Sequence, residues 1–168
     1  HRVDRRQRQM CIRDRYTGTF TIGCTTPSFD LETSINEHFS IEHITNELII
    51  ATTRHFIGEI EQKPPIFSAI KKDGKRLYEL ARAGETTEIK TRKVNVFEFE
   101  ITKIDLPTIE FKVVCSKGTY IRSLANDFGK ALKSGAHLSS LRRTKIGNYS
   151  VEDAMDIDLF LNTISSNT

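Results

Sequence analysis

The stretch CSKGTYIRSLANDFGKALKSGAHLSSLRRT, residues 115–144, decides the fold because it leads from an apolar strand through a glycine turn into an amphipathic helix. The segment IEFKVVCS, residues 109–116, alternates between apolar and polar side chains, which predicts a half-buried strand. Gly118 allows a sharp backbone turn, and Thr119 can cap the helix that follows. One face of this helix is apolar, with Ile121, Leu124, Ala125, Phe128 and Leu132 as its predicted core residues.

Tyr120 and Arg122 open this helix and project over the end of the strand, where binding groups often lie. A helix start exposes free N–H groups, so a positive Arg122 gains nothing from the helix dipole there. An arginine in such a place needs a carboxylate or phosphate partner. Spacing alone favours a simpler alternative, a capped helix with a solvated arginine.

The segments before this stretch indicate an α+β protein with a largely antiparallel sheet. YTGTFTIG, which starts at residue 16, alternates as a half-buried strand does, and Pro27 marks a loop after it. Ser40 can cap a helix that ends near Gly58. The predicted inner face of that helix consists of Ile44, Leu48, Ala51 and His55.

The middle of the chain predicts further short elements. KPPIFSAIKKDGKRLYELARAG indicates a strand over residues 66–70, a turn at residues 73–74 and a helix over residues 75–83. KVNVFEFEITKID, residues 93–105, is a strand whose apolar residues change phase, which predicts a bulge. Pro107 separates this strand from the next one, so the two are predicted to form a hairpin.

Composition indicates a globular domain, with 38% hydrophobic and 28% charged residues among 168. No run approaches the roughly 20 apolar residues of a membrane span. Cys11, Cys24 and Cys115 lack CxxC spacing, and the histidines lack ligand-like spacing, so no disulfide framework or metal site is predicted. GxSxG, Walker, GxGxxG and HExxH motifs are absent. Cys115 lies on an alternating apolar strand, which favours a buried, inert thiol over a nucleophile.

The net charge of +3 comes from residues 1–15, which hold six arginines and two aspartates. The remaining chain carries 19 basic and 20 acidic side chains. Because the composition changes sharply at Tyr16, we expect residues 1–15 to be a foreign or mis-assembled leader. A nucleic-acid-binding arm is the alternative.

Two basic clusters outside this leader are candidates for contacts with RNA. Arg142 and Arg143 follow the apolar Leu141, while Lys71 and Lys75 flank a predicted turn. Basic groups together with tyrosines near strand ends fit phosphate contact combined with stacking on a base. Runs of charge are more often solvated faces, so composition alone supports RNA binding weakly.

Several motifs resemble the TruB family of bacterial tRNA pseudouridine synthases. They are YTGTFTIGCTTPSFDLE, KPPIFSAIKKDGKRLYELARAGE, CSKGTYIRSLANDFGKAL, GAHLSSLRRT and IGNYS, in the family's order from Tyr16 to about Ser150. The resemblance implies a pseudouridine synthase fold, α+β with a mixed, largely antiparallel sheet flanked by helices. It also implies a cytoplasmic, monomeric enzyme that isomerises uridine 55 in the TΨC loop of tRNA without a metal or an organic cofactor.

The resemblance further implies roles for four side chains. Arg122 would pair with the catalytic aspartate, and Tyr120 would contact the flipped base. Tyr16 would stack on the target base and take part in removing the proton from its C5 atom, while Leu141 would line the uridine pocket. These roles are physically coherent, since a flipped base needs aromatic and apolar surfaces, and a nearby cation keeps a carboxylate ionised.

The family's nucleophilic aspartate lies in a GxLDPxAxG motif, which the 168 residues lack. We therefore expect the partner of Arg122 to lie outside this chain. We expect residues 16–150 to be the second half of a catalytic domain, and residues 151–168 a short tail with no separate RNA-binding domain. Two hypotheses remain open: a fragment of a pseudouridine synthase, or an RNA-contacting fragment without catalytic competence. An in-frame GxLDPxAxG upstream of Tyr16 in the gene would favour the first.

Overall fold

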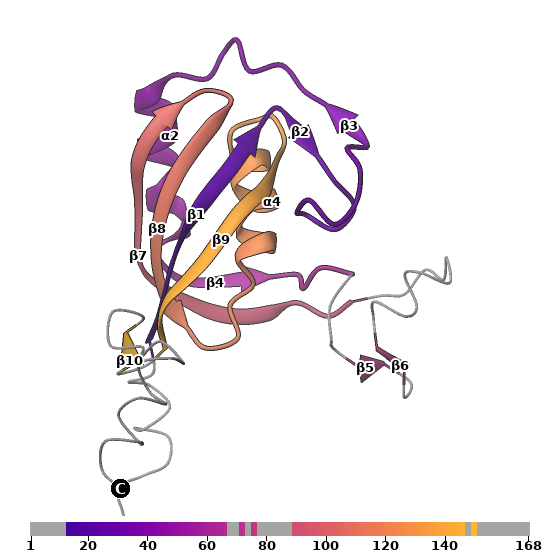
Figure 1. The fold of residues 1–168 in the computed structure, drawn as a ribbon, viewed down its shortest axis with the longest axis vertical. Helices are drawn as coiled ribbons and strands as arrows, with labels where there is room; N and C mark the ends of the chain where they lie inside the picture. Colours follow the sequence, from indigo (N-terminus) through magenta and orange to yellow (C-terminus); the bar gives the residue numbers. More distant parts are fainter. Residues whose placement is uncertain (1–12, 67–70, 73–74, 77–88, 147–148, 151–168) are drawn as a thin grey trace, which may run out of the picture.

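A six-stranded sheet forms the centre of the computed structural model, which describes residues 13–66, 71–72, 75–76, 89–146 and 149–150 (Figure 1). The strand order is β10-β9-β1-β8-β7-β4, and neighbouring strands within the described residues are all antiparallel. These strands are β1 (Arg13–Ile22), β4 (Gly58–Gln62), β7 (Arg92–Asp105), β8 (Thr108–Ser116), β9 (Ala136–Ile146) and β10 (Tyr149–Ser150). Two small ladders pair β2 (Cys24–Thr25) with β3 (Glu37–His38), and β5 (Lys71–Lys72) with β6 (Lys75–Arg76).

Helices α2 (Asn46–Thr53) and α4 (Ile121–Ala131) lie against one face of this sheet (Figure 1). Phenylalanine rings fill the space between the layers. The ring of Phe20 is centred 4.2 Å from that of Phe111 and 5.9 Å from that of Phe128. The predicted apolar stripe of α4 is buried along its whole length, so the α+β class and the flanking helix are both confirmed.

The turn into α4 has the predicted glycine but a different cap. Gly118 has a φ of 86°, the left-handed region that favours glycine. The N-cap is Tyr120, whose side chain makes no capping bond, and not Thr119. The Thr119 hydroxyl instead donates to the carbonyl of Ser116 at 2.7 Å, which closes the turn after β8. The predicted cap was wrong because the turn uses this hydroxyl before the helix begins.

Helix α2 starts later than the prediction from Ser40. Its N-cap is Thr45, whose hydroxyl accepts from the backbone N–H of Leu48 at 3.1 Å. A short 3-10 helix, η1 (Arg54–Phe56), follows it. Within α2, Ile49 is the fully buried apolar residue. Of the predicted inner face, Ile44 is buried and Leu48 half-buried, but Ala51 and His55 are exposed. The later start changes which side chains face the sheet.

Strand β1 begins at Arg13, three residues before the predicted start, and pairs with both β8 and β9. The bulge predicted in the strand before Pro107 is confirmed by register shifts after Val96 and Ile101. The hairpin of β7 with β8 is confirmed as well.

The helix predicted over residues 75–83 is wrong at its start, because residues 75–76 form β6 and pair back onto β5. The predicted strand at residues 66–70 falls mostly outside the described residues, as do the turn at residues 73–74 and the remainder of that helix. No helix in the described part of the chain is long and apolar enough to cross a membrane.

Candidate active site

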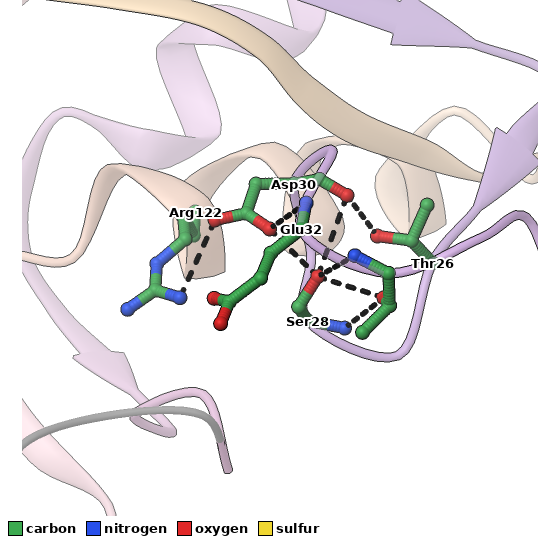
Figure 2. A network of polar contacts seen from close by, with 6 residues as sticks. Thr26, Ser28, Asp30, Glu32 and Arg122 are labelled. Atoms are coloured by element: carbon green, nitrogen blue, oxygen red, sulfur yellow. Dashed lines mark hydrogen bonds and ion pairs between the residues drawn. The ribbon is translucent and has the colours of Figure 1, made fainter. Parts of the chain in front are cut away.

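Arg122 lies in the first turn of α4, and its side chain has a carboxylate partner within the chain. Its Nη1 atom is 3.4 Å from Oδ2 of Asp30, a residue 92 positions away in the loop after β2 (Figure 2). The side chains are 22% and 24% exposed, so the pair is mostly shielded from water. The expectation that the partner of Arg122 lies outside this chain was therefore wrong. The expectation that an arginine at this helix start needs an anionic partner is confirmed.

The loop around Asp30 holds its carboxylate in one orientation. The hydroxyl of Ser28 donates to Oδ1 of Asp30 at 2.6 Å, and the backbone N–H of Glu32 donates to the same oxygen at 2.9 Å (Figure 2). The hydroxyl of Thr26 donates to the carbonyl of Asp30 at 2.6 Å. Ser28 is fully buried, so its hydroxyl has a fixed position. With Oδ1 bonded within the loop, Oδ2 is directed toward Arg122.

A cavity of about 390 Å³ lies beside this pair. It is lined by Asp30, Leu31, Glu32, Arg122 and residues 138–141 of β9. Leu141 is 45% exposed, a large apolar side chain at the edge of a polar site. The structure thus brings together two of the predicted site residues, Arg122 and Leu141. It also adds Asp30, which sequence reasoning placed in a loop but did not connect with Arg122.

Tyr16 lies on β1 next to this part of β9. It is paired with Arg143, and Gly18, two residues further along β1, is paired with Leu141. Tyr16 and Leu141 therefore share one face of neighbouring strands, although Tyr16 does not line the cavity itself. Burial raises the pKa of the Tyr16 phenol, and the positive charge of Arg143 opposes that rise.

Arg143 connects Tyr16 with the buried start of β1. Its Nη2 atom donates to Oδ2 of Asp14 at 2.6 Å, and its guanidinium lies 5.6 Å from the centre of the Tyr16 ring. The Asp14 side chain is 2% exposed and that of Arg143 is 42% exposed. Arg143 therefore packs beside a predicted site residue while part of its side chain stays accessible to solvent.

Tyr120 precedes α4 and is half-buried, but it does not line the cavity. Its backbone is held by the side chain of Gln62, a residue that the sequence did not single out. Among the RNA-contact candidates, Arg142 is exposed on β9, while Lys71 and Lys75 lie on the β5–β6 ladder. In the described residues no group of three or more His, Cys, Asp or Glu side chains could hold a metal ion.

Comparison with known proteins shows which class this fold and site define. The chain superposes on a chain of the "Crystal Structure of a Cbf5-Nop10-Gar1 Complex" with a TM-score of 0.64 and 25% identity, over 93% of this chain and 38% of that one. A second solved structure, "H/ACA RNP bound to a substrate RNA containing 2'-deoxyuridine", gives a TM-score of 0.61 at 21% identity, over 96% of this chain and 38% of that one. The fold is that of the pseudouridine synthases.

Sequence relatives narrow the class to one family. "TruB family pseudouridylate synthase (N terminal domain)" matches residues 7–121, and "tRNA pseudouridylate synthase B C-terminal domain" matches residues 122–167. "tRNA pseudouridine synthase B" of Flavobacterium johnsoniae is 68% identical over 145 residues, which are 86% of this chain and 63% of that protein. The protein of the same name from Phocaeicola vulgatus is 52% identical over 145 residues, 86% of this chain and 62% of that protein. The chain belongs to the TruB family, and it spans somewhat less than two thirds of these relatives.

Proposed function

We propose that the complete gene product isomerises uridine 55 in the TΨC loop of tRNA to pseudouridine. The observation that carries the proposal is the Arg122–Asp30 pair beside a cavity that Leu141 also lines. The pair with Asp30 fixes the Arg122 guanidinium beside the cavity, and its remaining N–H donors can bind a second, reacting carboxylate and keep it ionised. An apolar wall can receive a base removed from its stack. Family membership supports the same reaction class.

In the proposed reaction a carboxylate attacks the nucleoside, and the bond between N1 and the ribose breaks. The detached uracil rotates, and its C5 atom bonds to the ribose carbon that N1 left, which releases the carboxylate. The proton on C5 is then removed by a base, and N1 takes up a proton. Tyr16 lies beside Leu141 on the neighbouring strand, and burial raises the pKa of its phenol. We assign it to stacking on the base and to relaying the C5 proton. Tyr120 would contact the base from the helix side.

The proposed partner is the TΨC stem-loop of tRNA, bound by a monomeric cytoplasmic enzyme that uses no metal or organic cofactor. Lys71, Lys75, Arg142 and Arg143 are the proposed phosphate contacts. Arg142 and Arg143 follow Leu141 directly on β9, and their side chains leave the strand on opposite faces. Two of the proposed phosphate contacts are therefore adjacent to the proposed uridine pocket.

The 168-residue chain by itself is proposed to be inactive, because none of its aspartates stands in a GxLDPxAxG motif. Asp30 does not replace that nucleophile in the proposal, because it stands in TTPSFDLE and not in a GxLDPxAxG motif. A chain that contacts RNA without catalysis is the alternative.

The test compares the complete gene product with the 168-residue chain on a tRNA transcript. Pseudouridine is detected by mass spectrometry after chemical labelling. We expect modification at position 55 by the complete protein, none on a transcript with cytidine at that position, and none by the 168-residue chain. Turnover by the short chain would overturn its proposed inactivity, and an inactive complete protein would overturn the proposed function.

Tyr16→Phe in the complete protein tests the assigned chemistry. The ring still stacks but lacks the hydroxyl, so turnover should fall by about 100-fold or more while tRNA affinity changes little. Equal losses of binding and turnover would show that the tyrosine only positions the base.

A further inference from the structure

The start of α4 is held by a side chain from a distant strand. Its N-cap residue, Tyr120, makes no side-chain capping bond. Gln62, the last residue of β4, bonds both backbone groups of Tyr120: its Oε1 accepts from the N–H at 3.0 Å, and its Nε2 donates to the carbonyl oxygen at 3.2 Å. Gln62 is 1% exposed, so this double contact is made away from water.

A second contact fixes the other side of Arg122. The hydroxyl of Ser123 donates to the carbonyl of Lys63 at 2.7 Å, and Ser123 is also buried. Residues 62 and 63 therefore hold Tyr120, two positions before Arg122, and Ser123, the residue immediately after it. The backbone from which the Arg122 side chain leaves is tied to the end of β4, and cannot shift along the sheet without breaking these bonds.

The position of this backbone matters because the Arg122–Asp30 contact would be lost if the two side chains moved further apart. The Arg122 Nη1 atom is 3.4 Å from Asp30, near the upper limit of a hydrogen bond. Asp30 is held on its side by its own loop, so it cannot follow a displaced arginine. Misplacement of a catalytic group by about 1 Å can lower a rate by about 100-fold.

We propose that Gln62 is a positioning residue for Arg122: by clamping the Tyr120 backbone, it sets the distance between the Arg122 guanidinium and Asp30. The proposal rests on the proposed function for its effect on turnover. The clamp itself is a property of the fold and can be tested without turnover.

The chemistry of the clamp explains why an amide occupies this position. It needs one donor and one acceptor on the same side-chain group, and a neutral amide supplies both. Methionine has a similar length but would leave the Tyr120 N–H and its carbonyl without these partners. Glutamate would retain the acceptor, but its second oxygen would face the carbonyl oxygen of Tyr120 and repel it.

The experiment uses Gln62→Met in the complete gene product, with Ile49→Val as the control. Ile49 is fully buried in α2, away from the cavity, so its truncation lowers stability without touching the site. The single-turnover rate on the tRNA transcript should fall about 10- to 100-fold in Gln62→Met. In a separate steady-state measurement, KM should change less than about threefold. In Ile49→Val the rate should stay near that of the wild type.

A double-mutant cycle with Asp30 tests whether Gln62 changes the rate through the Arg122–Asp30 pair. If Gln62 acts by placing Arg122 against Asp30, then Gln62→Met should cost much less in an Asp30→Asn background, where the pair is already weakened. Fully additive losses, or a rate loss no greater than that of a control with the same melting temperature, would overturn the proposal. If Gln62→Met does not fold, Ser123→Ala replaces it as a milder variant. It removes only the bond to Lys63 and should lower the rate about threefold.

A crystal structure of Gln62→Met separates this proposal from the proposed function. The Arg122–Asp30 separation should exceed hydrogen-bonding distance in the variant, whether or not the wild type acts on tRNA. An unchanged separation would overturn the positioning role. An inactive wild type with a lengthened pair in the variant would overturn the proposed function and leave the clamp supported.

Discussion

At the scale of single residues, Arg122 shows how a charged side chain can be stabilised by distant parts of the chain. Its carboxylate partner lies 92 positions earlier, and Gln62 and Lys63 hold Tyr120 and Ser123 on its two sides. Neither contact is visible in the local pattern GTYIR. The local pattern shows that a cation stands at a helix start, where it is unfavourable without an anion.

Arg122→Met should lower stability rather than raise it. The variant leaves the mostly shielded carboxylate of Asp30 without its cation, so we expect a loss of about 1 kcal/mol in the free energy of unfolding, the upper range for a partly exposed pair. Urea unfolding of the complete gene product measures the change, with the exposed Arg142→Met as the control. An equal or higher stability for Arg122→Met would show that the pair contributes nothing to the fold.

We predict that the free energy of unfolding falls at alkaline pH because of Cys115. Burial raises the pKa of its thiol from 9.0 to about 11, because the thiolate is disfavoured in the core. The unfolded chain ionises first, so the stabilising effect is complete below pH 9 and is lost as the pH rises toward 11. A shift of this size corresponds to about 2–3 kcal/mol.

Unfolding by urea at pH 8 and pH 10.5 should reveal this loss, and Cys115→Ala should reduce it. Burial also raises the pKa of Tyr16, so part of the alkaline loss should remain in the variant. An alkaline loss of the same size in wild type and variant would contradict a buried neutral thiol at Cys115.

At the scale of elements, α4 is specified on both faces. Its apolar stripe packs on the phenylalanines of the sheet, and its last turn lies against the start of β9. Gly129 makes this close approach possible, because a Cβ there would collide with the backbone of Gly135 and Ala136. The glycine is therefore needed for packing, although it weakens the helix by its propensity.

Gly129→Ala separates packing from propensity. Helix propensity alone would add about 1 kcal/mol, but the collision should give a net loss of about 2–3 kcal/mol. The control Ala131→Gly, at the exposed last residue of the same helix, should lose less than about 1 kcal/mol, the cost of glycine in a helix interior. Thermal melts of both variants decide, and a stabilised Gly129→Ala would show that the helix and β9 can separate without cost.

At the scale of the whole molecule, net charge does not explain an affinity for RNA. Without residues 1–15 the chain carries one more acidic than basic side chain, so attraction to phosphates has to come from local clusters. Such clusters bind by releasing counterions, which makes affinity fall with salt.

Lys71→Gln combined with Lys75→Gln should therefore reduce the salt dependence of tRNA binding. Loss of two phosphate contacts would lower the magnitude of the slope of log K against log salt by about 1.5. The control pair Lys103→Gln and Lys130→Gln removes the same charge elsewhere on the molecule and should leave the slope unchanged. Binding titrations at several salt concentrations measure the slope, and equal effects of the two pairs would argue against a local contact.

The sequence by itself determined the α+β class, the strand–turn–helix unit around Gly118, the buried stripe of α4, the bulge of β7 and the family. These features follow from periodicity and turn chemistry, which depend on residues close together in the chain. The sequence-based prediction misplaced the starts of α2 and β1, because helix and strand ends depend on which caps and partners the folded chain supplies.

Only the tertiary structure decided that Asp30 is the partner of Arg122 and that Gln62 holds the start of α4. Asp30 lies in a loop and Gln62 at the end of an edge strand, 92 and 58 positions from the residues they contact. No periodic pattern relates residues at such separations. Which carboxylate reaches an arginine, and which amide reaches a backbone, depends on how the sheet brings its strand ends and loops together around the helix.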